Sequence, residues 1–131
     1  MVIVDTSVWF DYFAGASNAE TEWLDVEIGK HRLGVTDMIL CEILQGSRTD
    51  TEFRVLREAM LKFEVFETGG PEMAKASAEN YRLLRKKGFT TRKTIDCWIA
   101  TFCMRERHTL LHRDRDFQPF EKQLGLFVLH A

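Results

Sequence analysis

Short apolar runs alternate with longer amphipathic segments along this chain. The runs are rich in Val, Leu, Ile and Phe, which is typical of buried strands, whereas the longer segments repeat apolar residues at helical spacing. We expect strands at residues 2–4, 33–36, 63–66, 110–112 and 126–129. We expect helices at residues 8–14, 19–31, 38–45, 50–62, 71–87, 95–107 and briefly after 116, with Ser7, Asp37, Thr94 and Asp116 as caps. This alternation predicts an α/β fold with a central, mostly parallel sheet covered on both faces.

The length of 131 residues is close to the usual size of one domain. The sequence contains no internal repeat, low-complexity stretch or linker. We therefore expect residues 1–131 to form a single domain with one core.

Four carboxylates stand among apolar residues. Asp5 follows the first expected strand and Asp114 follows the strand at 110–112, while Glu42 and Asp96 lie inside otherwise apolar helical stretches. Unpaired buried carboxylates are costly, so they normally need a cation. Mg²⁺ and Mn²⁺ prefer oxygen ligands and share themselves with phosphate oxygens, which indicates metal-dependent phosphoester chemistry.

Three of these acids also have structural explanations. Asp5 can cap the helix that follows it, and Asp96 lies in a first turn, where the helix dipole favours an acid. Glu42 could instead form a buried ion pair with Arg48 or Arg113. Because these explanations are independent, their conjunction is less economical than one shared metal site.

The acids near the last expected strand form a charged turn. Asp114 and Asp116 alternate with Arg113 and Arg115, a pattern that is also compatible with a solvated surface turn. His112 precedes Asp114 by two residues and could approach the site, although a histidine packed at the strand end is the favoured interpretation. Asp114 and Asp116 are both candidate metal ligands.

Two hydroxyl groups follow the first acid. Thr6 and Ser7 could tune the site by hydrogen bonding a carboxylate or a metal-bound water. Neither is expected to act as a nucleophile, since no histidine or lysine with an assignable base role accompanies them.

Charge is unevenly distributed, although the net formal charge is only −2. Residues 1–81 hold 7 Lys and Arg against 15 Asp and Glu, whereas residues 82–115 hold 10 of the 18 Lys and Arg. This asymmetry suggests that one face meets a polyanion. Solvated helix faces are the alternative, above all for Arg82 and Arg85. The candidate phosphate-binding residues are Lys86, Lys87, Arg92, Lys93, Arg113 and Arg115.

The cysteines and the hydropathy bear on location. Cys41, Cys97 and Cys103 form an odd count without metal-binding spacing, and each lies in an apolar helical context. We expect all three to be reduced core residues of a cytoplasmic protein. No run of 18 apolar residues occurs, so no membrane association is expected.

Two other phosphoryl chemistries fit the acids poorly. A phosphoacceptor receiver domain predicts an aspartate at the end of a central mid-chain strand, where this chain offers only Glu67. A haloacid-dehalogenase-type phosphatase predicts Asp-x-Asp after the first strand, where this chain has Asp5-Thr6-Ser7.

Four motifs together resemble those of one known family, the PIN-domain ribonucleases, and within them the VapC toxins of toxin–antitoxin pairs. They are Val2-Ile3-Val4-Asp5-Thr6-Ser7-Val8-Trp9, Thr36 to Gly46 around Glu42, Ile95-Asp96-Cys97-Trp98-Ile99-Ala100, and His112-Arg113-Asp114-Arg115-Asp116-Phe117. The resemblance covers nearly the whole chain, and the order and spacing of the motifs are more specific than any one motif.

The resemblance implies a three-layer α/β/α domain and endonucleolytic cleavage of RNA that depends on Mg²⁺ or Mn²⁺. Asp5, Glu42, Asp96 and Asp114 would be the four catalytic acids and Asp116 an auxiliary one. It also implies control by a cognate VapB-type antitoxin and assembly as a homodimer. A non-catalytic PIN-like binding module is the alternative.

The first expected helix carries more aromatic residues than one buried stripe needs, namely Trp9, Phe10, Tyr12 and Phe13. Complete burial in the core would explain them. Partial exposure would instead create a groove suited to an antitoxin helix or to a second copy of the chain, both known in the resembled family.

Overall fold

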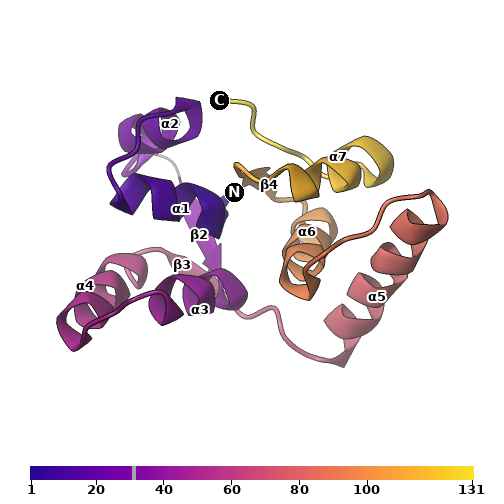
Figure 1. Cartoon of the computed structure of the whole chain (residues 1–131), viewed down its shortest axis with the longest axis horizontal. Coiled ribbons are helices and arrows are strands. Elements are labelled where there is room, and N and C mark those ends of the chain that lie inside the picture. The colour runs from indigo at the N-terminus through magenta and orange to yellow at the C-terminus, as the bar shows by residue number, and fades with distance from the viewer. Residues whose placement is uncertain (31) are drawn as a thin grey trace.

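The computed structural model of the chain describes residues 1–30 and 32–131. Its centre is a four-stranded parallel sheet in the order β3-β2-β1-β4 (Figure 1). The strands are β1 (Val2–Val4), β2 (Leu33–Thr36), β3 (Glu64–Phe66) and β4 (Thr109–Leu111). Val2 pairs with Leu33 on one side and with Thr109 on the other, so the first strand is central. The parallel sheet expected from the alternating pattern is confirmed.

Within the described residues, seven α-helices surround this sheet. They are α1 (Thr6–Phe13), α2 (Ala19–Glu27), α3 (Asp37–Gln45), α4 (Asp50–Met60), α5 (Pro71–Lys86), α6 (Thr94–Glu106) and α7 (Gln118–Leu124), the last preceded by the 3₁₀ turn η1 (Arg115–Phe117). In Figure 1, α1 to α4 gather in the left half and α5 to α7 in the right half, with the strands between them. The layers are those of the predicted α/β/α domain.

The helix starts differ from the expected caps by one or two residues. Asp5, Thr36 and Lys93 are the capping positions, rather than Ser7, Asp37 and Thr94, and each has an extended backbone, so the helix begins directly after it. The side chains of Asp5 and Thr36 also accept a hydrogen bond from a first-turn N–H, whereas Lys93 makes no such bond. Asp116 lies inside η1, and the short helix that carries Pro119 begins after Phe117, which makes no side-chain cap.

Two element boundaries were wrong in a larger way. The helix expected at 19–31 ends at Glu27, ahead of Gly29, whose φ of 94° does not fit a right-handed helix; residue 31 lies outside the described residues. The strand expected at 126–129 is only a single parallel bridge between Leu110 and Val128. Because β4 itself has three residues, it offers this segment little more than the two hydrogen bonds made by Leu110.

The core lies between the sheet and the helices. Ile3 and Val4 of β1 are fully buried, as are Trp9 of α1 and the two phenylalanines Phe117 and Phe120. Cys97 and Cys103 are buried as expected, but Cys41 is exposed because it lies on the solvent side of α3. Of the helices that the described residues form, none combines the length and apolar character needed to cross a membrane.

Gly34 lies in a crowded part of the sheet. A Cβ atom added there would lie 2.8 Å from side-chain atoms of Ile3, Met1 and Phe66. A larger residue would therefore have to displace these side chains, at the position where β2 pairs with both β1 and β3.

Candidate metal centre

The sheet order brings the first and the last acids together. β1 and β4 are neighbours, and the backbone N–H of Asp5 donates to the carbonyl of Leu111 at 2.9 Å. Both strands therefore end at one edge of the sheet, as ligand-binding segments of open parallel sheets do. Asp5 caps α1 at this edge, and Asp114 follows β4 and starts η1.

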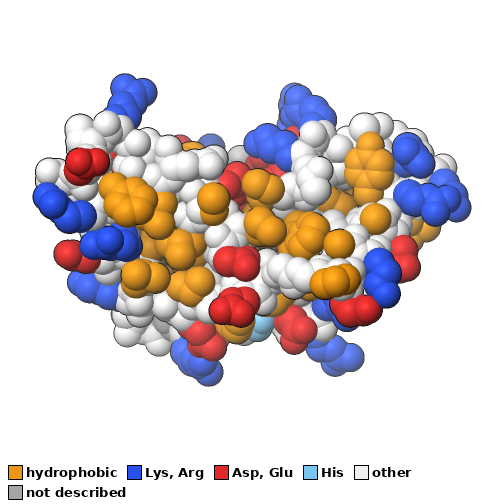
Figure 2. All heavy atoms as spheres, turned by 90° about the horizontal axis from the view of Figure 1, so that it is seen from below, with side chains coloured by type: hydrophobic (Ala, Val, Ile, Leu, Met, Phe, Trp, Pro, Cys, Tyr) orange, Lys and Arg blue, Asp and Glu red, His pale blue; other side chains and the backbone are white. Residues whose placement is uncertain are grey.

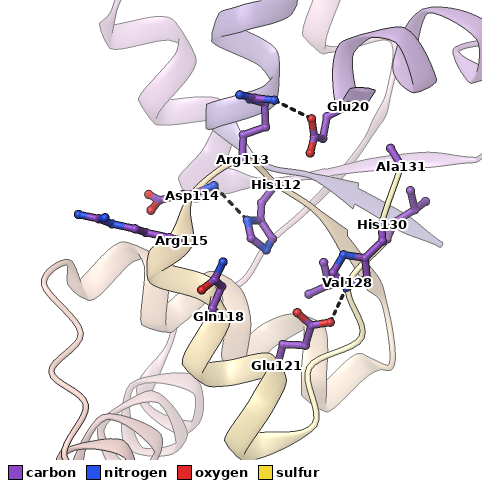
Figure 3. Close-up of a pocket in the computed structure, with 11 residues that line it drawn as sticks. Glu20, His112, Arg113, Asp114, Arg115, Gln118, Glu121, Val128, His130 and Ala131 are labelled. Carbon is purple, nitrogen blue, oxygen red and sulfur yellow. Dashed lines mark hydrogen bonds and ion pairs between the residues drawn. The ribbon is translucent and has the colours of Figure 1, made fainter. Parts of the chain in front are cut away.

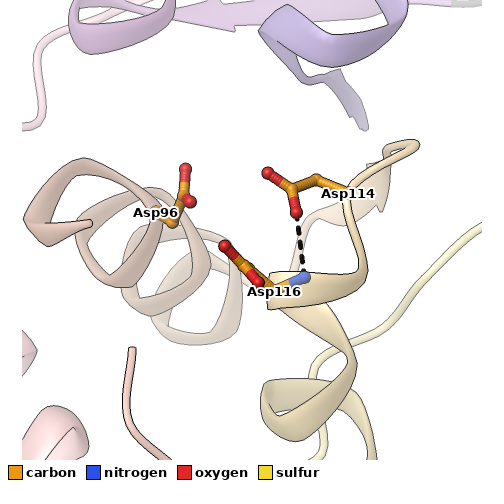
Figure 4. Close-up of side chains that lie close together, drawn as sticks. All are labelled: Asp96, Asp114 and Asp116. Carbon is orange, nitrogen blue, oxygen red and sulfur yellow. Dashed lines mark hydrogen bonds between the residues drawn. The ribbon is translucent and has the colours of Figure 1, made fainter. Parts of the chain in front are cut away.

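Three aspartates form a compact cluster. Asp96 in the first turn of α6, Asp114 and Asp116 each offer a carboxylate oxygen within 4.8 Å of the others. Figure 4 shows the three side chains pointing toward one another. Asp114 also accepts a 2.9 Å hydrogen bond from the backbone N–H of Asp116, which fixes the turn between them. A triad of oxygen donors this close fits a divalent cation.

Asp5 serves both as a cap and as a member of the site. It is only 3% exposed, and its Oδ2 accepts hydrogen bonds from the Ser7 N–H at 3.1 Å and the Ser7 hydroxyl at 2.6 Å. Its Oδ1 is buried and has no hydrogen-bond partner within the described structure, and the same is true of Oδ2 of Asp96. Buried oxygens without donors are the atoms that a cation would satisfy.

Glu42 joins the site from α3. Its Oε1 accepts a 2.8 Å hydrogen bond from the hydroxyl of Thr6, and its side chain is half-buried. Among the described residues it forms no ion pair with Arg48 or Arg113, so the alternative of a buried salt bridge is wrong. Thr6 and Ser7 thus each hold one carboxylate, as the sequence suggested for hydroxyls beside the first acid.

The acids raise one another's pKa values. Burial and, after it, the charges of Asp5, Asp114 and Glu42 together raise the pKa of Asp96 to about 7. Burial also raises the pKa of Asp5, with a further contribution from Asp114, and burial and Asp5 together raise the pKa of Glu42. Lys93 opposes the shift at Asp96 and Glu42. The site therefore concentrates negative charge that a cation would relieve.

Two of the six candidate phosphate-binding residues contact the acids. Arg92 donates to both carboxylate oxygens of Asp116, at 3.0 and 3.2 Å, and the Lys93 ammonium lies 4.0 Å from Asp114. Both cations come from the loop between α5 and α6 and remain largely exposed. They place positive charge at the edge of the acidic cluster.

The other four cations are placed differently. Arg115 is exposed on η1, and Lys86 and Lys87 are exposed at the end of α5. The guanidinium of Arg113 instead points toward Glu20, as Figure 3 shows, and pairs with Glu20 at 2.9 Å and with Asp11 at 3.3 Å. Arg113 is thus not brought to the acidic cluster, because α1 and α2 supply its counter-ions.

His112 supports the loop of Asp114. Its ring packs against Phe117 at 4.9 Å, and its Nδ1 accepts a 3.0 Å hydrogen bond from the backbone N–H of Asp114. The favoured interpretation, a histidine packed at the strand end, agrees with this placement. A cavity of about 360 Å³ lies beside it, bordered by Gln118, Glu121 and His130 (Figure 3).

The sequence analysis missed a set of hydrogen bonds through Thr68 that connects the two helices carrying Glu42 and Asp96. Asp37, at the start of α3, accepts hydrogen bonds from both the N–H and the hydroxyl of Thr68. The indole N–H of Trp98 in α6 donates to the carbonyl of Thr68 at 2.7 Å. No sequence signal links these three residues, because they meet only through the tertiary fold.

Comparisons with known proteins agree with this geometry. A family model described as PIN domain matches residues 2–122. Ribonuclease VapC11 of Mycobacterium tuberculosis (strain ATCC 25618 / H37Rv) and VapC ribonuclease Mb1587 of Mycobacterium bovis are each 32% identical over 130 residues, which is 96% of this chain and of each relative.

Solved structures share the fold at lower identity. The structure of VapBC2 from Rickettsia felis bound to a promoter DNA fragment aligns with a TM-score of 0.78 and 15% identity, covering 100% of this chain and 99% of that chain. FitAcB from Neisseria gonorrhoeae aligns with a TM-score of 0.72 and 19% identity, covering 99% and 97%. The chain therefore belongs to the PIN domain family and, within it, to the VapC ribonucleases.

Proposed function

We propose that this chain is the endoribonuclease toxin of a type II toxin–antitoxin pair and hydrolyses RNA phosphodiester bonds with the help of Mg²⁺ or Mn²⁺. The observation that carries the proposal is the convergence of five carboxylates from four separate segments, two of them with buried oxygens that lack partners in the described structure. Its relatives at 32% identity are ribonucleases. A phosphoacceptor or non-catalytic binding domain is not favoured.

The cation would be held by Asp96, Asp114 and Asp116, with Asp5 and Glu42 completing the site. A bound divalent cation lowers the pKa of water and neutralises charge on phosphoryl oxygens. The oxygen-only donor set fits Mg²⁺ and Mn²⁺ better than softer metals.

The chain's own residues orient the reacting groups. Thr6 and Ser7 hold Glu42 and Asp5 in place, and the Ser7 hydroxyl also accepts a 3.0 Å hydrogen bond from the backbone N–H of Arg113. Both hydroxyls thus serve to position carboxylates. Arg92 and Lys93, which contact Asp116 and Asp114, and the exposed Arg115 would bind phosphates of the RNA.

We further propose that a VapB-type antitoxin binds the aromatic face of α1. Trp9 is buried, but Phe10 and Phe13 are 48% and 42% exposed and border a cavity of about 260 Å³ with Ile43 and Leu56. Figure 2 shows hydrophobic side chains gathered over the half that contains α3 and α4, and again toward α6, with acidic side chains between them. Similar solved structures include VapBC2 from Rickettsia felis and a toxin–antitoxin complex from Klebsiella pneumoniae. A homodimer is the second assembly that we propose.

The test is cleavage of total RNA by the purified chain with Mg²⁺, with Mn²⁺ or with EDTA. We expect discrete fragments that require the metal and disappear in Asp5→Asn and Asp96→Asn, while Glu58→Gln, which alters an exposed acid of α4, cleaves as the wild type does. Folded protein that leaves RNA intact with either metal would contradict the proposal.

A further inference from the structure

Another cavity adjoins the acidic cluster on the side of the loop between α5 and α6. Its volume is about 260 Å³, close to the lower limit of roughly 300 Å³ for pockets that hold drug-sized ligands. One wall consists of Phe89, Thr90 and Thr91, and the other includes Arg115 and Lys122. A cavity of this size suits a group no larger than one heterocyclic base.

The cavity and the acidic cluster share a residue. Asp116 lines the cavity and is also a member of the triad with Asp96 and Asp114. Arg92, from the same loop as the cavity wall, holds Asp116 through both of its carboxylate oxygens. A strand whose phosphate lies at the acids therefore has the cavity directly beside it.

Phe89 is fixed in place by the end of α5. Gly88, with a φ of 92°, turns the chain, and the N–H groups of Gly88 and Phe89 donate to the carbonyls of Arg85 and Leu84. This is a Schellman motif, which often carries an apolar residue at the position of Phe89. The cap alone would be served by an aliphatic side chain, yet the residue is a phenylalanine that is 38% exposed and faces the cavity.

The remaining groups suit a nucleotide. Arg115 and Lys122 are exposed cations, and within the described structure neither has an ion pair with an acid. Thr90 and Thr91 supply hydroxyls beside the aromatic ring. An aromatic platform flanked by cations is the arrangement with which proteins bind unpaired bases, because bases stack on the ring while phosphates meet the charges.

We propose that this cavity binds one unpaired nucleobase of the RNA substrate, next to the phosphate at the acids, and that the base stacks on Phe89. The inference rests on the proposed function and names the substrate at that same site as single-stranded. Arg115 and Lys122 hold the phosphate that adjoins the bound base.

The test separates stacking from phosphate binding. Fluorescence anisotropy with EDTA present measures the affinity for a single-stranded oligoadenylate of about 12 nucleotides and for a strand of equal length whose riboses carry no base. Phe89→Leu retains the apolar cap residue without the ring, and Phe89→Tyr retains the ring. Phe53→Leu is the matched control, because Phe53 on α4 is also 38% exposed and lies away from the cavity.

We expect Phe89→Leu to weaken the affinity for oligoadenylate about fivefold and to leave the affinity for the base-free strand unchanged, as loss of one stack predicts. Phe89→Tyr and Phe53→Leu should bind both strands as the wild type does. Equal weakening of both strands, no weakening of either, or no binding of oligoadenylate by the wild type would overturn the proposal. If the chain cleaves RNA but Phe89→Leu binds oligoadenylate as the wild type does, only the proposed base site is refuted. If no metal-dependent cleavage occurs, the proposed function itself is refuted.

Discussion

The hydroxyl of Thr6 donates a 2.8 Å hydrogen bond to Oε1 of Glu42, across 36 residues of sequence. The next residue, Ser7, holds Asp5 in the same way. Because Thr6 is only 6% exposed, this hydrogen bond is largely shielded from water. It fixes α3 relative to the start of α1. Two consecutive hydroxyl groups thus orient two acids that come from different elements.

Removal of the Thr6 hydroxyl should impair the orientation of Glu42 more than it impairs folding. Thr6→Val keeps the shape of the side chain, and we expect it to lower the free energy of unfolding by about 1 kcal/mol. Cleavage should fall about tenfold, since Glu42 loses its donor. Single-turnover cleavage together with calorimetric titration of Mg²⁺ checks this. Thr6→Ser should restore both properties, and a valine variant with wild-type metal affinity would show that the bond has no positioning role.

The raised pKa of Asp96 makes stability depend on pH. The pKa is about 7 in the folded state against 3.8 for an ordinary aspartate, so the folded chain binds more protons than the unfolded chain between these values. Without metal, the free energy of unfolding should therefore fall as the pH rises through this window. At about pH 7.5, Asp96→Asn should be more stable than the wild type by on the order of 1–2 kcal/mol, with little difference at about pH 4.

Urea unfolding with EDTA measures this effect, and Asp50→Asn, an exposed acid of α4, is the control. Added Mg²⁺ should reverse the order near neutral pH, because the cation stabilises the ionised wild-type site and finds one ligand fewer in the variant. The same stability for both proteins at both pH values would contradict the assigned pKa.

Arg92 should influence the metal and the RNA in opposite directions. The Arg92 guanidinium and a bound metal ion would compete for the same carboxylate of Asp116. Arg92→Gln should therefore bind Mg²⁺ more tightly and single-stranded RNA more weakly, with a smaller dependence of RNA affinity on salt. Titration with each ligand at two salt concentrations measures the two effects. Arg82→Gln, an exposed change on α5, should alter neither; a loss of both affinities in Arg92→Gln would instead indicate misfolding.

The hydrogen bonds through Thr68 should contribute mainly to the free energy of unfolding. Thr68→Val removes the buried hydroxyl that donates to Asp37 and leaves one partly buried carboxylate oxygen with fewer donors. We expect a loss of about 1–3 kcal/mol in the free energy of unfolding, measured by urea denaturation. Thr68→Ser should recover most of it. Equal stability of the valine and serine variants would mean that packing alone supports this loop.

The sheet and the acids could be predicted from the sequence because both produce local patterns along the chain. Asp5 directly follows a buried strand, and Glu42 and Asp96 interrupt apolar helical stretches, so each is visible without knowledge of distant contacts. The cap of α1 was misplaced because Asp5 and Ser7 are both good capping residues, and only the backbone geometry distinguishes them.

Long-range pairing could not be read in the same way. Arg113 was expected near RNA, but its counter-ions Asp11 and Glu20 are about a hundred residues distant in the sequence. The exposure of Phe89 beside a cavity follows from the turn at Gly88 and from the surface of α7 that faces it, and no local pattern shows either of these. Such placements depend on which surfaces meet after the strands have paired.

The order of the strands along the chain determines when, during translation, the acids of the site can first come together. Asp5 is translated about a hundred residues before Asp114 and Asp116, although β1 and β4 are neighbours in the sheet. A nascent chain therefore carries Asp5 through the synthesis of β2, β3 and α6 before the acidic cluster can form.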